Sequence, residues 1–242
     1  MTPMMQQYFE IKNKYRDFIL FYRLGDFYEM FFDDAQVASA ELELTLTGRD
    51  CGEEERAPMC GVPYHSCEPY IGKLIEKGYK VAICEQVEDP KAARGIVRRE
   101  VTRIITPGTL IETDLLNEKS NNYLATIYFD GDSLGMCFAD ISTAYISATS
   151  FSGTLSAESV INELSTYNPK EIIISAALKS LPKIAEHIKT RMETSVSESA
   201  SAFFVPDEAI ERTEAQFSPE QTAGKPRSAI IAVGAALKYI AD

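Results

Sequence analysis

The stretch Phe18-Ile-Leu-Phe-Tyr-Arg-Leu-Gly-Asp-Phe-Tyr-Glu-Met-Phe-Phe32 predicts two adjoining β-strands joined by a tight turn. Both runs are rich in aromatic residues, which favour strands, and Leu24-Gly25-Asp26 between them is typical of a turn. In a strand, residues two apart share a face. The second run therefore has an apolar face formed by Tyr28, Met30 and Phe32, and a mixed face formed by Phe27, Glu29 and Phe31.

The mixed face carries the first indication of function. A carboxylate is not expected to lie unpaired in a core, so the face with Phe27 and Glu29 should be accessible near the turn. An exposed aromatic ring beside a carboxylate is unusual for a purely structural strand. Taken alone, however, the burial habit of phenylalanine favours the structural interpretation.

The sequence around this hairpin predicts helices and further strands. Thr2 and Pro3 are typical of a helix start, and Asp33 and Asp34 are expected to supply the cap and the dipole partner of a helix that runs to about Glu43. In the rest of the first half we expect a helix over Pro69–Lys77, closed by Gly78, and strands over Tyr79–Gln86 and Ile96–Ile105.

The second half changes pattern, because three runs separated by Gly- or Ser-bearing turns predict a β-meander followed by helix, strand and helix. The expected strands are Tyr123–Phe129, Leu134–Asp140, Ala144–Ser150 and Glu171–Ser175; the expected helices are Ser156–Tyr167, capped by Ser156, and Ala229–Ala241, capped by Ser228; the expected loops are 194–201 and 218–227. We interpret the fold class as α/β mixed with two domains, 1–115 and 116–242, joined near residues 108–121.

Composition limits the class of protein. The chain has 242 residues, of which 45% are apolar and 25% charged, ordinary values for a globular protein with two cores. The longest apolar run, Ala229–Leu237, is too short to span a membrane, and residues 1–10 lack a secretory pattern, so we expect an intracellular protein without membrane contact. The net charge is −12, and residues 1–115 carry 14 basic and 20 acidic groups. Because phosphate neutralisation requires positive charge, any nucleic-acid contact is expected through a local patch.

Sequence motifs of common enzymes are missing. The chain contains no G-x-x-x-x-G-K-[ST], no G-x-G-x-x-G and no G-x-S-x-G, so we expect no ATP hydrolysis and no catalytic residue. The five cysteines are odd in number and form no C-x-x-C pair, which argues against a disulfide framework. Cys60, His65 and Cys67 lie close together, but no second ligand pair follows at zinc-site spacing, and no metal site is expected.

Several blocks, in order along nearly the whole chain, resemble the MutS family of DNA mismatch-repair proteins. The similarity is dense through residue 110 and looser after about 145. Gly25-Asp-Phe-Tyr-Glu-Met-Phe31 resembles the family's Phe-x-Glu mismatch-reading motif. The other blocks are Thr2–Tyr8, Phe21–Arg23, Pro58–His65, Val81–Gln86, Asp89-Pro90, Arg103–Thr109 and Asp140–Ser142.

The resemblance implies a mismatch-recognition domain followed by a ribonuclease-H-like connector domain, in a protein whose ATPase lies outside this chain. It implies that Phe27 is the wedge and Glu29 the carboxylate that contacts a base. The implied partners are double-stranded DNA with mismatches, a MutL-type protein through the connector, and a second copy in a homodimer formed only by the full-length protein. ATP and Mg are implied cofactors of the full-length protein and not of this part. The implied location is the bacterial cytoplasm, in association with the nucleoid.

The physics of a wedge is consistent with these roles. Inserting an apolar side chain between base steps costs a few kcal/mol of unstacking, and this cost is least where pairing is already faulty. Stacking of the ring on a base returns about 1–3 kcal/mol. The net free energy of insertion is therefore favourable at a mismatch, where the duplex is easily deformed, and unfavourable on sound duplex. The negative field of DNA and the loss of water favour the protonated form of Glu29, and our hypothesis is that Glu29 is ionised in the free protein and shares or takes a proton in the complex.

A short basic segment is expected to support this site through the DNA backbone. Only Glu100 opposes five basic groups between residues 91 and 103. Such a run is commonly a solvated face, but beside this motif it becomes a candidate for phosphate contact. The candidates are Lys91, Arg94, Arg98, Arg99 and Arg103, and the segment from Met59 to His65 is a further candidate on resemblance alone.

Two alternatives remain open. Asp140-Ile-Ser142 resembles the metal-binding aspartate of ribonuclease-H-like nucleases, so a metal-dependent nuclease is the runner-up. Two-metal chemistry needs convergent carboxylates. Beyond Asp130, Asp132 and Asp140 the sequence offers only Glu163, expected as a helix-surface charge, and Glu171, expected as a strand-start charge. The other alternative, a scaffold paralogue of the family, is disfavoured because Phe27 and Glu29 are both present.

Overall fold

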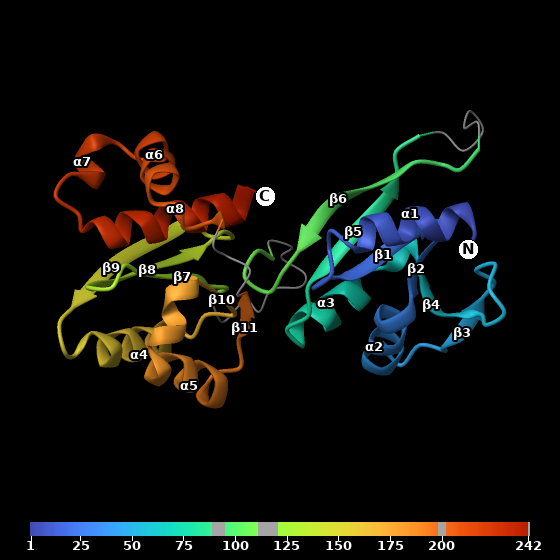
Figure 1. Cartoon of the computed structure of the whole chain (residues 1–242), viewed down its shortest axis with the longest axis horizontal. Helices are drawn as coiled ribbons and strands as arrows, with labels where there is room; N and C mark the ends of the chain where they lie inside the picture. The colour runs from blue at the N-terminus through green and yellow to red at the C-terminus, as the bar shows by residue number, and fades with distance from the viewer. Residues whose placement is uncertain (89–94, 111–120, 198–201, 242) are drawn as a thin grey trace. The chain divides into compact units, whose positions relative to one another are not determined.

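The computed structural model describes residues 1–88, 95–110, 121–197 and 202–241 of the chain. The chain divides into two compact units, Met1–Thr106 and Pro107–Asp242, called here the first and second unit (Figure 1). The domain junction expected at 115/116 lies outside the described residues.

The first unit is built on a six-stranded mixed sheet in the order β3-β4-β2-β1-β5-β6. Strands β1 and β5 are parallel, and the other pairs are antiparallel. The hairpin predicted around Gly25 is confirmed as β1 and β2, in a register that pairs Leu24 with Phe27. The strands are β1 (Ile19–Leu24), β2 (Phe27–Phe31), β3 (Thr47–Arg49), β4 (Ala57–Pro63), β5 (Val81–Gln86) and β6 (Arg99–Ile105).

In the described part of this unit, the sheet is flanked by the α-helices α1 (Pro3–Lys12), α2 (Phe32–Leu42) and α3 (Glu68–Glu76), with a 3-10 turn η1 (Tyr64–Ser66) after β4. The Thr2 cap is confirmed, since its side chain accepts a hydrogen bond from the Met5 amide. The expected Asp33–Asp34 cap is wrong, because α2 begins at Phe32 without a side-chain cap. Asp34 is instead buried and accepts hydrogen bonds from Lys12 Nζ at 2.8 Å and from the Leu20 amide at 3.0 Å. It thereby joins α1, β1 and α2.

The strand-to-helix corner after β2 differs from the sequence prediction. Phe32 has a φ of 53°, so the alternation of faces ends at Phe31 and Phe32 does not continue the face of Tyr28 and Met30. The Phe32 ring lies beside Phe9 of α1, with ring centroids 5.0 Å apart. A tight corner at Phe32 lets β2 pass directly into α2.

The second unit contains a five-stranded mixed sheet in the order β11-β10-β7-β8-β9. The predicted meander is confirmed as β7 to β9, antiparallel neighbours, while β7, β10 and β11 are parallel. The strands are β7 (Leu124–Phe129), β8 (Ser133–Asp140), β9 (Tyr145–Ser152), β10 (Glu171–Ile174) and β11 (Ser195–Ser197); the helices are α4 (Ser156–Tyr167), η2 (Ala176–Ser180), α5 (Pro182–Arg191), α6 (Pro206–Gln216), α7 (Pro219–Thr222) and α8 (Arg227–Ala241).

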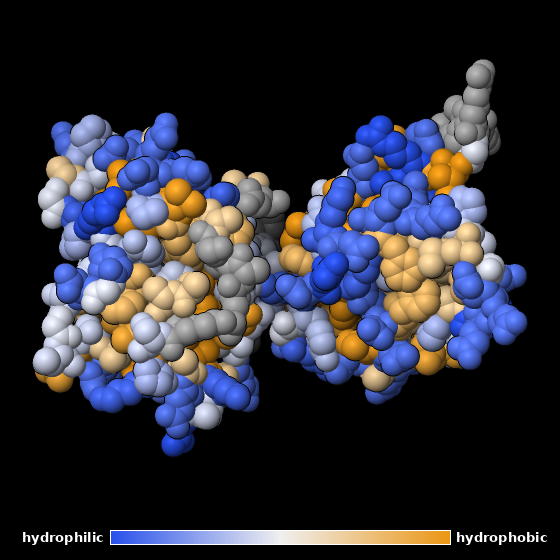
Figure 2. Space-filling model, viewed as in Figure 1, coloured by the Kyte–Doolittle hydropathy of each residue, from blue (hydrophilic) through white to orange (hydrophobic). Residues whose placement is uncertain are grey.

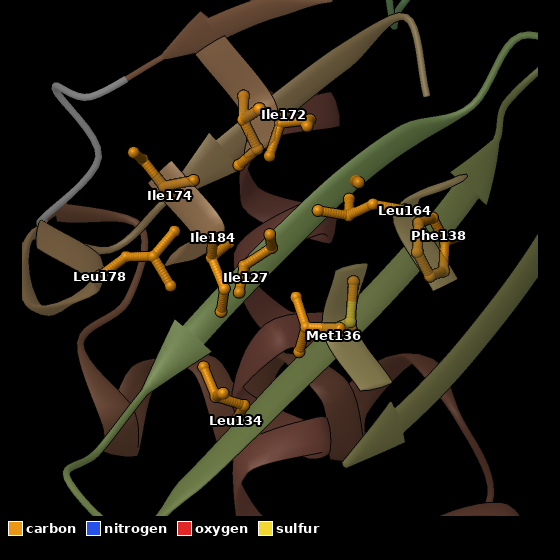
Figure 3. Packing of buried hydrophobic residues seen from close by; sticks show 12 residues of the cluster. Ile127, Leu134, Met136, Phe138, Leu164, Ile172, Ile174, Leu178 and Ile184 are labelled. Atoms are coloured by element: carbon orange, nitrogen blue, oxygen red, sulfur yellow. The ribbon is translucent and has the colours of Figure 1, made fainter. Parts of the chain in front are cut away.

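Helices cover both faces of this second sheet (Figure 1). On one face, side chains of β7, β8 and β10 pack against α4, η2 and α5, and Figure 3 shows Ile127, Met136 and Ile172 converging with Leu164 and Ile184. On the other face, α8 and α6 cover Leu124, Cys137 and Ile173. Because helices cover both faces of the sheet, successive side chains of β7 and β8 are buried on opposite sides, and both strands are apolar on both faces.

Several local expectations for the second unit are wrong. The expected loop 194–201 contains the short strand β11, and the expected loop 218–227 contains α7. Ser156 does not cap α4, whose N-cap is Leu155 without a side-chain bond. Ser228 lies inside α8, where it is buried and its hydroxyl lies 2.8 Å from that of Ser150.

Glu171 lies at the start of β10, as expected from the sequence, and it is fully buried. Its carboxylate accepts hydrogen bonds from the Tyr239 hydroxyl at 2.6 Å, the Gly108 amide at 3.2 Å and the Ser197 hydroxyl at 3.3 Å. A Cβ added to Gly108 would come within 2.9 Å of Glu171 Cβ. The carboxylate therefore fixes the segment at Gly108, β11 and the end of α8 to one another.

We expect Glu171→Ala to lower the free energy of unfolding of the second unit by about 2–3 kcal/mol, because buried donors lose their acceptor. Chemical denaturation of the chain followed by circular dichroism measures this loss. Glu186→Ala, on the exposed side of α5, is the matched control and should change stability by less than about 0.5 kcal/mol. Equal midpoints for the two variants would refute the structural role of Glu171.

The surface of both units is largely hydrophilic on the face drawn in Figure 2, interrupted by smaller hydrophobic patches. Among the described residues, no helix combines the length and the apolar character needed to cross a membrane.

Candidate nucleic-acid interface

Phe27 lies at the exposed end of a face that becomes buried along β2. Its relative exposure is 46%, whereas Phe31 on the same face is 0% exposed. The difference arises because Tyr8 of α1 packs on Phe31, with ring centroids 5.1 Å apart. Glu29 lies between these two rings with a side chain that is 13% exposed. The expected accessible end of the mixed face is therefore confirmed.

The turn before Phe27 is held by contacts on both sides. Gly25 has a φ of 60°, a conformation that glycine adopts without strain. Arg23 Nε donates a hydrogen bond to the Gly25 carbonyl oxygen, and the Tyr64 amide donates one to Asp26 at 2.9 Å. The Arg23 guanidinium also lies 3.5 Å from the centroid of the Tyr64 ring, which is itself 40% exposed. A second accessible aromatic ring and a cation thus stand next to the turn.

Behind the turn, Glu85 of β5 connects the two strands of the hairpin. It accepts hydrogen bonds from the Tyr28 hydroxyl and from Arg23 Nη1. Burial, together with the bond to Glu85, raises the pKa of Tyr28 above its ordinary value, so this hydroxyl stays protonated and donates at physiological pH. The network restrains β1 and β2 and thereby fixes the direction of the Phe27 backbone.

Glu29 is paired with Arg49, which lies at the end of β3. Arg49 Nη1 is 2.7 Å from one carboxylate oxygen and 2.5 Å from the other. The Arg49 side chain is 37% exposed and the Glu29 side chain 13%, so the ion pair lies where the core of the first unit meets solvent. Gly61 is directly across from Glu29 on β4, and a Cβ there would lie 3.4 Å from Glu29 Cγ, so a glycine leaves room for the carboxylate.

The expected basic segment is only partly described, because Lys91 and Arg94 lie outside the described residues. Arg98 is exposed and forms an ion pair with Glu100. Arg103 lies 3.4 Å from Glu68, with a side chain that is 38% exposed. These two side chains are accessible to an approaching phosphate.

Arg99 departs from that expectation because it points inward and is only 7% exposed. Its guanidinium donates hydrogen bonds to the carbonyl oxygens of Arg23 at 2.7 Å and Val97 at 2.8 Å, and lies over the Tyr22 ring. Arg99 therefore braces the hairpin from β6. The segment from Met59 to His65, a candidate that we interpret from the sequence as a loop, is instead mostly strand β4 followed by η1.

The carboxylates of the nuclease alternative do not converge. Asp130 follows β7 and Asp140 ends β8, and the antiparallel register pairs Phe129 with Leu134 and Leu124 with Ala139, so the two lie at opposite ends of the hairpin. Asp140 is buried and accepts bonds from Ser142 and from the Asn122 amide, while Asp130 accepts bonds from the Asp132 and Ser133 amides. Asp130 therefore serves its local turn, and Asp140 connects the turn after β8 to the chain at Asn122.

Within the described ranges, no group of three or more His, Cys, Asp or Glu side chains is placed to hold a metal ion. Cys60 and Cys67 are buried, and burial raises the pKa of Cys60 to about 11 and that of Cys67 above its ordinary value.

Comparison with known proteins assigns each unit to a domain type. Residues 2–114 match the model of MutS domain I, and residues 122–242 match that of MutS domain II. The chain is 50% identical over 222 residues to the DNA mismatch repair protein MutS of Clostridium tetani, covering 91% of this chain and 25% of that protein. It is 48% identical over 244 residues to the MutS of Lachnoclostridium phytofermentans, covering 99% and 26%.

A mixed α/β chain that carries these two domains in this order belongs to the class of DNA mismatch-repair proteins. The chain belongs to the MutS family. It spans about a quarter of the length of the relatives that it matches.

The sequence predictions missed Arg49 at this site and included Tyr64 only as one member of the segment from Met59 to His65. Arg49 is 20 positions from Glu29, and β3 is only three residues long, so no local pattern indicated the pair. Within the segment from Met59 to His65, Tyr64 could have been singled out from its place directly after the strand that pairs with β2.

Proposed function

We propose that this chain is the mismatch-reading and connector part of a MutS-type DNA mismatch-repair protein. The observation that carries the proposal is the exposed Phe27 ring at the end of a rigid hairpin, with Glu29 two residues away on the same face. An exposed ring on a restrained strand loses little conformational entropy on insertion. It gains stacking where a base pair is already weak, and faces the full unstacking cost elsewhere.

In this proposal the partner of the first unit is double-stranded DNA with mismatched or unpaired bases. Arg98 and Arg103 are the described candidates for backbone contact, and Arg99 is left out because it is buried. The second unit acts as a connector that relays DNA binding to an ATPase, contacts a MutL-type protein, and works in a full-length homodimer that uses ATP and Mg. The proposed location is the bacterial cytoplasm, associated with the nucleoid.

The test compares a complete MutS carrying this chain on matched duplex and on duplexes with a G·T pair or one unpaired base. The proposal requires tighter binding to the faulty duplexes and loss of that preference when the Phe27 ring is removed. Equal affinity for matched and faulty duplexes in the unmodified protein would refute it.

Glu29→Gln tests the part played by charge. The glutamine keeps the shape of the side chain and removes its negative charge, so that the positive charge of Arg49 is no longer offset beside the DNA phosphates. We expect binding to matched duplex to be preserved or strengthened, by up to about fivefold, corresponding to roughly 1 kcal/mol for one exposed charge interaction. The ratio of the affinity for mismatched duplex to that for matched duplex should fall accordingly, as measured by fluorescence anisotropy at fixed salt concentration.

Glu186→Gln on α5 makes the same change in net charge away from the site and is the matched control. Weaker binding of Glu29→Gln to matched duplex would contradict the idea that repulsion by Glu29 disfavours sound DNA.

A further inference from the structure

Arg49 contacts Glu29 through a single nitrogen. Of the contacts within the described residues, only Nη1 takes part in the pair, and it reaches both carboxylate oxygens. An arginine carries five N–H donors in a planar fork that matches phosphate as well as carboxylate. The rest of this guanidinium, on a side chain that is 37% exposed, is therefore available to an anion from solvent.

The position of Arg49 makes DNA the relevant source of that anion. Strand β3 is the edge strand of the sheet, and Arg49 is its last residue. Its guanidinium is fixed beside Glu29, two residues along β2 from the exposed Phe27 ring. A duplex that places a base step against Phe27 brings its phosphates close to this edge, since phosphates flank every base step.

The charge balance at Glu29 differs between sound and faulty DNA. An isolated carboxylate close to phosphates is repelled, and pairing with Arg49 cancels its charge. When Glu29 instead shares a proton with a displaced base, as the hypothesis drawn from the mismatch-reading motif has it, the carboxylate is no longer a full negative charge that Arg49 must neutralise. The hydrogen bonds of Arg49 to a phosphate are then stronger than those to Glu29, because the phosphate is fully ionised and the proton-sharing carboxyl is not.

We propose that Arg49 is the ion-pair switch of this site: it neutralises Glu29 in the free protein and on sound duplex, and moves to a DNA phosphate when Glu29 engages a displaced base. This inference rests on the proposed function of Phe27 and Glu29. It adds a residue that contributes to specificity through a difference in phosphate contacts and reads no base itself.

The switch predicts a difference in salt dependence. Each phosphate neutralised adds about 0.9 to the slope of log affinity against log salt concentration on duplex DNA. In a complete MutS carrying this chain, the slope for a mismatched duplex should therefore exceed that for matched duplex by about one. Arg49→Gln should remove this difference and weaken mismatch binding about tenfold. Arg49→Lys should keep the slope difference with weaker binding, since it retains the charge without the fork.

A double variant separates the two roles of Arg49. Arg49→Gln alone leaves Glu29 unneutralised and should weaken matched binding a few-fold, and adding Glu29→Gln should restore matched binding but not the mismatch slope. Arg227→Gln is the matched control, an arginine of the second unit that lies 3.5 Å from Asp207. It changes the net charge equally and should preserve the slope difference. Thermal unfolding of each variant checks that the first unit is intact.

Each outcome decides one question. If the unmodified protein shows equal slopes, or if the double variant regains mismatch binding and its slope, the switch is overturned. Phe27→Ala measured on the same duplexes tests the proposed function separately. Should Phe27→Ala abolish the preference while the slopes are equal, only the switch fails; should Phe27→Ala leave the preference intact, the proposed function fails.

Discussion

Phe27→Ala in a complete MutS carrying this chain is expected to lower affinity for mismatched duplex by about 5- to 150-fold, the equivalent of losing roughly 1–3 kcal/mol of ring stacking. Binding to matched duplex should hardly change, because there the ring is not inserted. The salt slope should stay the same, since no charge is removed. Titration of both duplexes across a salt series measures all three quantities.

The ring is 46% exposed in the free protein, so its loss should alter folding stability by only about 0.5 kcal/mol or less. Tyr145→Ala is the matched control, because Tyr145 is an aromatic residue of similar exposure, 43%, in the second unit. A uniform loss of affinity on both duplexes with a shallower salt slope would assign Phe27 to backbone contact and remove the wedge.

Gly135→Ala is expected to destabilise the second unit by more than about 3 kcal/mol, with a fall in melting temperature of about 10 °C or more. A Cβ at Gly135 of β8 would lie 2.0 Å from the Ser228 carbonyl oxygen at the start of α8. The obstacle is backbone and not a flexible side chain, so α8 would have to move away from the sheet. Gly234→Ala should act similarly, because its Cβ would lie 2.0 Å from the Ala209 carbonyl oxygen of α6.

Hydrogen exchange read by mass spectrometry locates the effect, since peptides of the second unit should exchange faster while those of the first unit stay unchanged. Gly224→Ala is the control: its φ of 70° costs about 1 kcal/mol, but a Cβ there meets no atom within 4 Å. If Gly135→Ala were no more destabilising than Gly224→Ala, the close packing of α8 on β8 would be wrong.

Strands with a clear alternation were predictable because their signal is local. The hairpin around Gly25, the meander after Tyr123 and the strand at Glu171 appear within one or two residues of their predicted positions. The three-residue strands β3 and β11 were not predictable, because their hydrogen-bonding partners β4 and β10 lie elsewhere in the chain. Helix caps were the weakest predictions, since Asp34 and Ser228 turned out to bond across the fold and not to their own helix ends.

The sequence by itself determined the class of fold, the position of the hairpin and the two residues that share the mixed face of β2, because side-chain alternation and turn chemistry act over a few residues. Only the tertiary structure decided that Arg49 pairs with Glu29, that Arg99 points inward and that Glu171 is buried with its donors around it. Each of these depends on which distant backbone segments lie side by side. A charged side chain pairs with the group that the fold brings within about 3 Å of it, and the residues next to it in the sequence do not indicate which group that is.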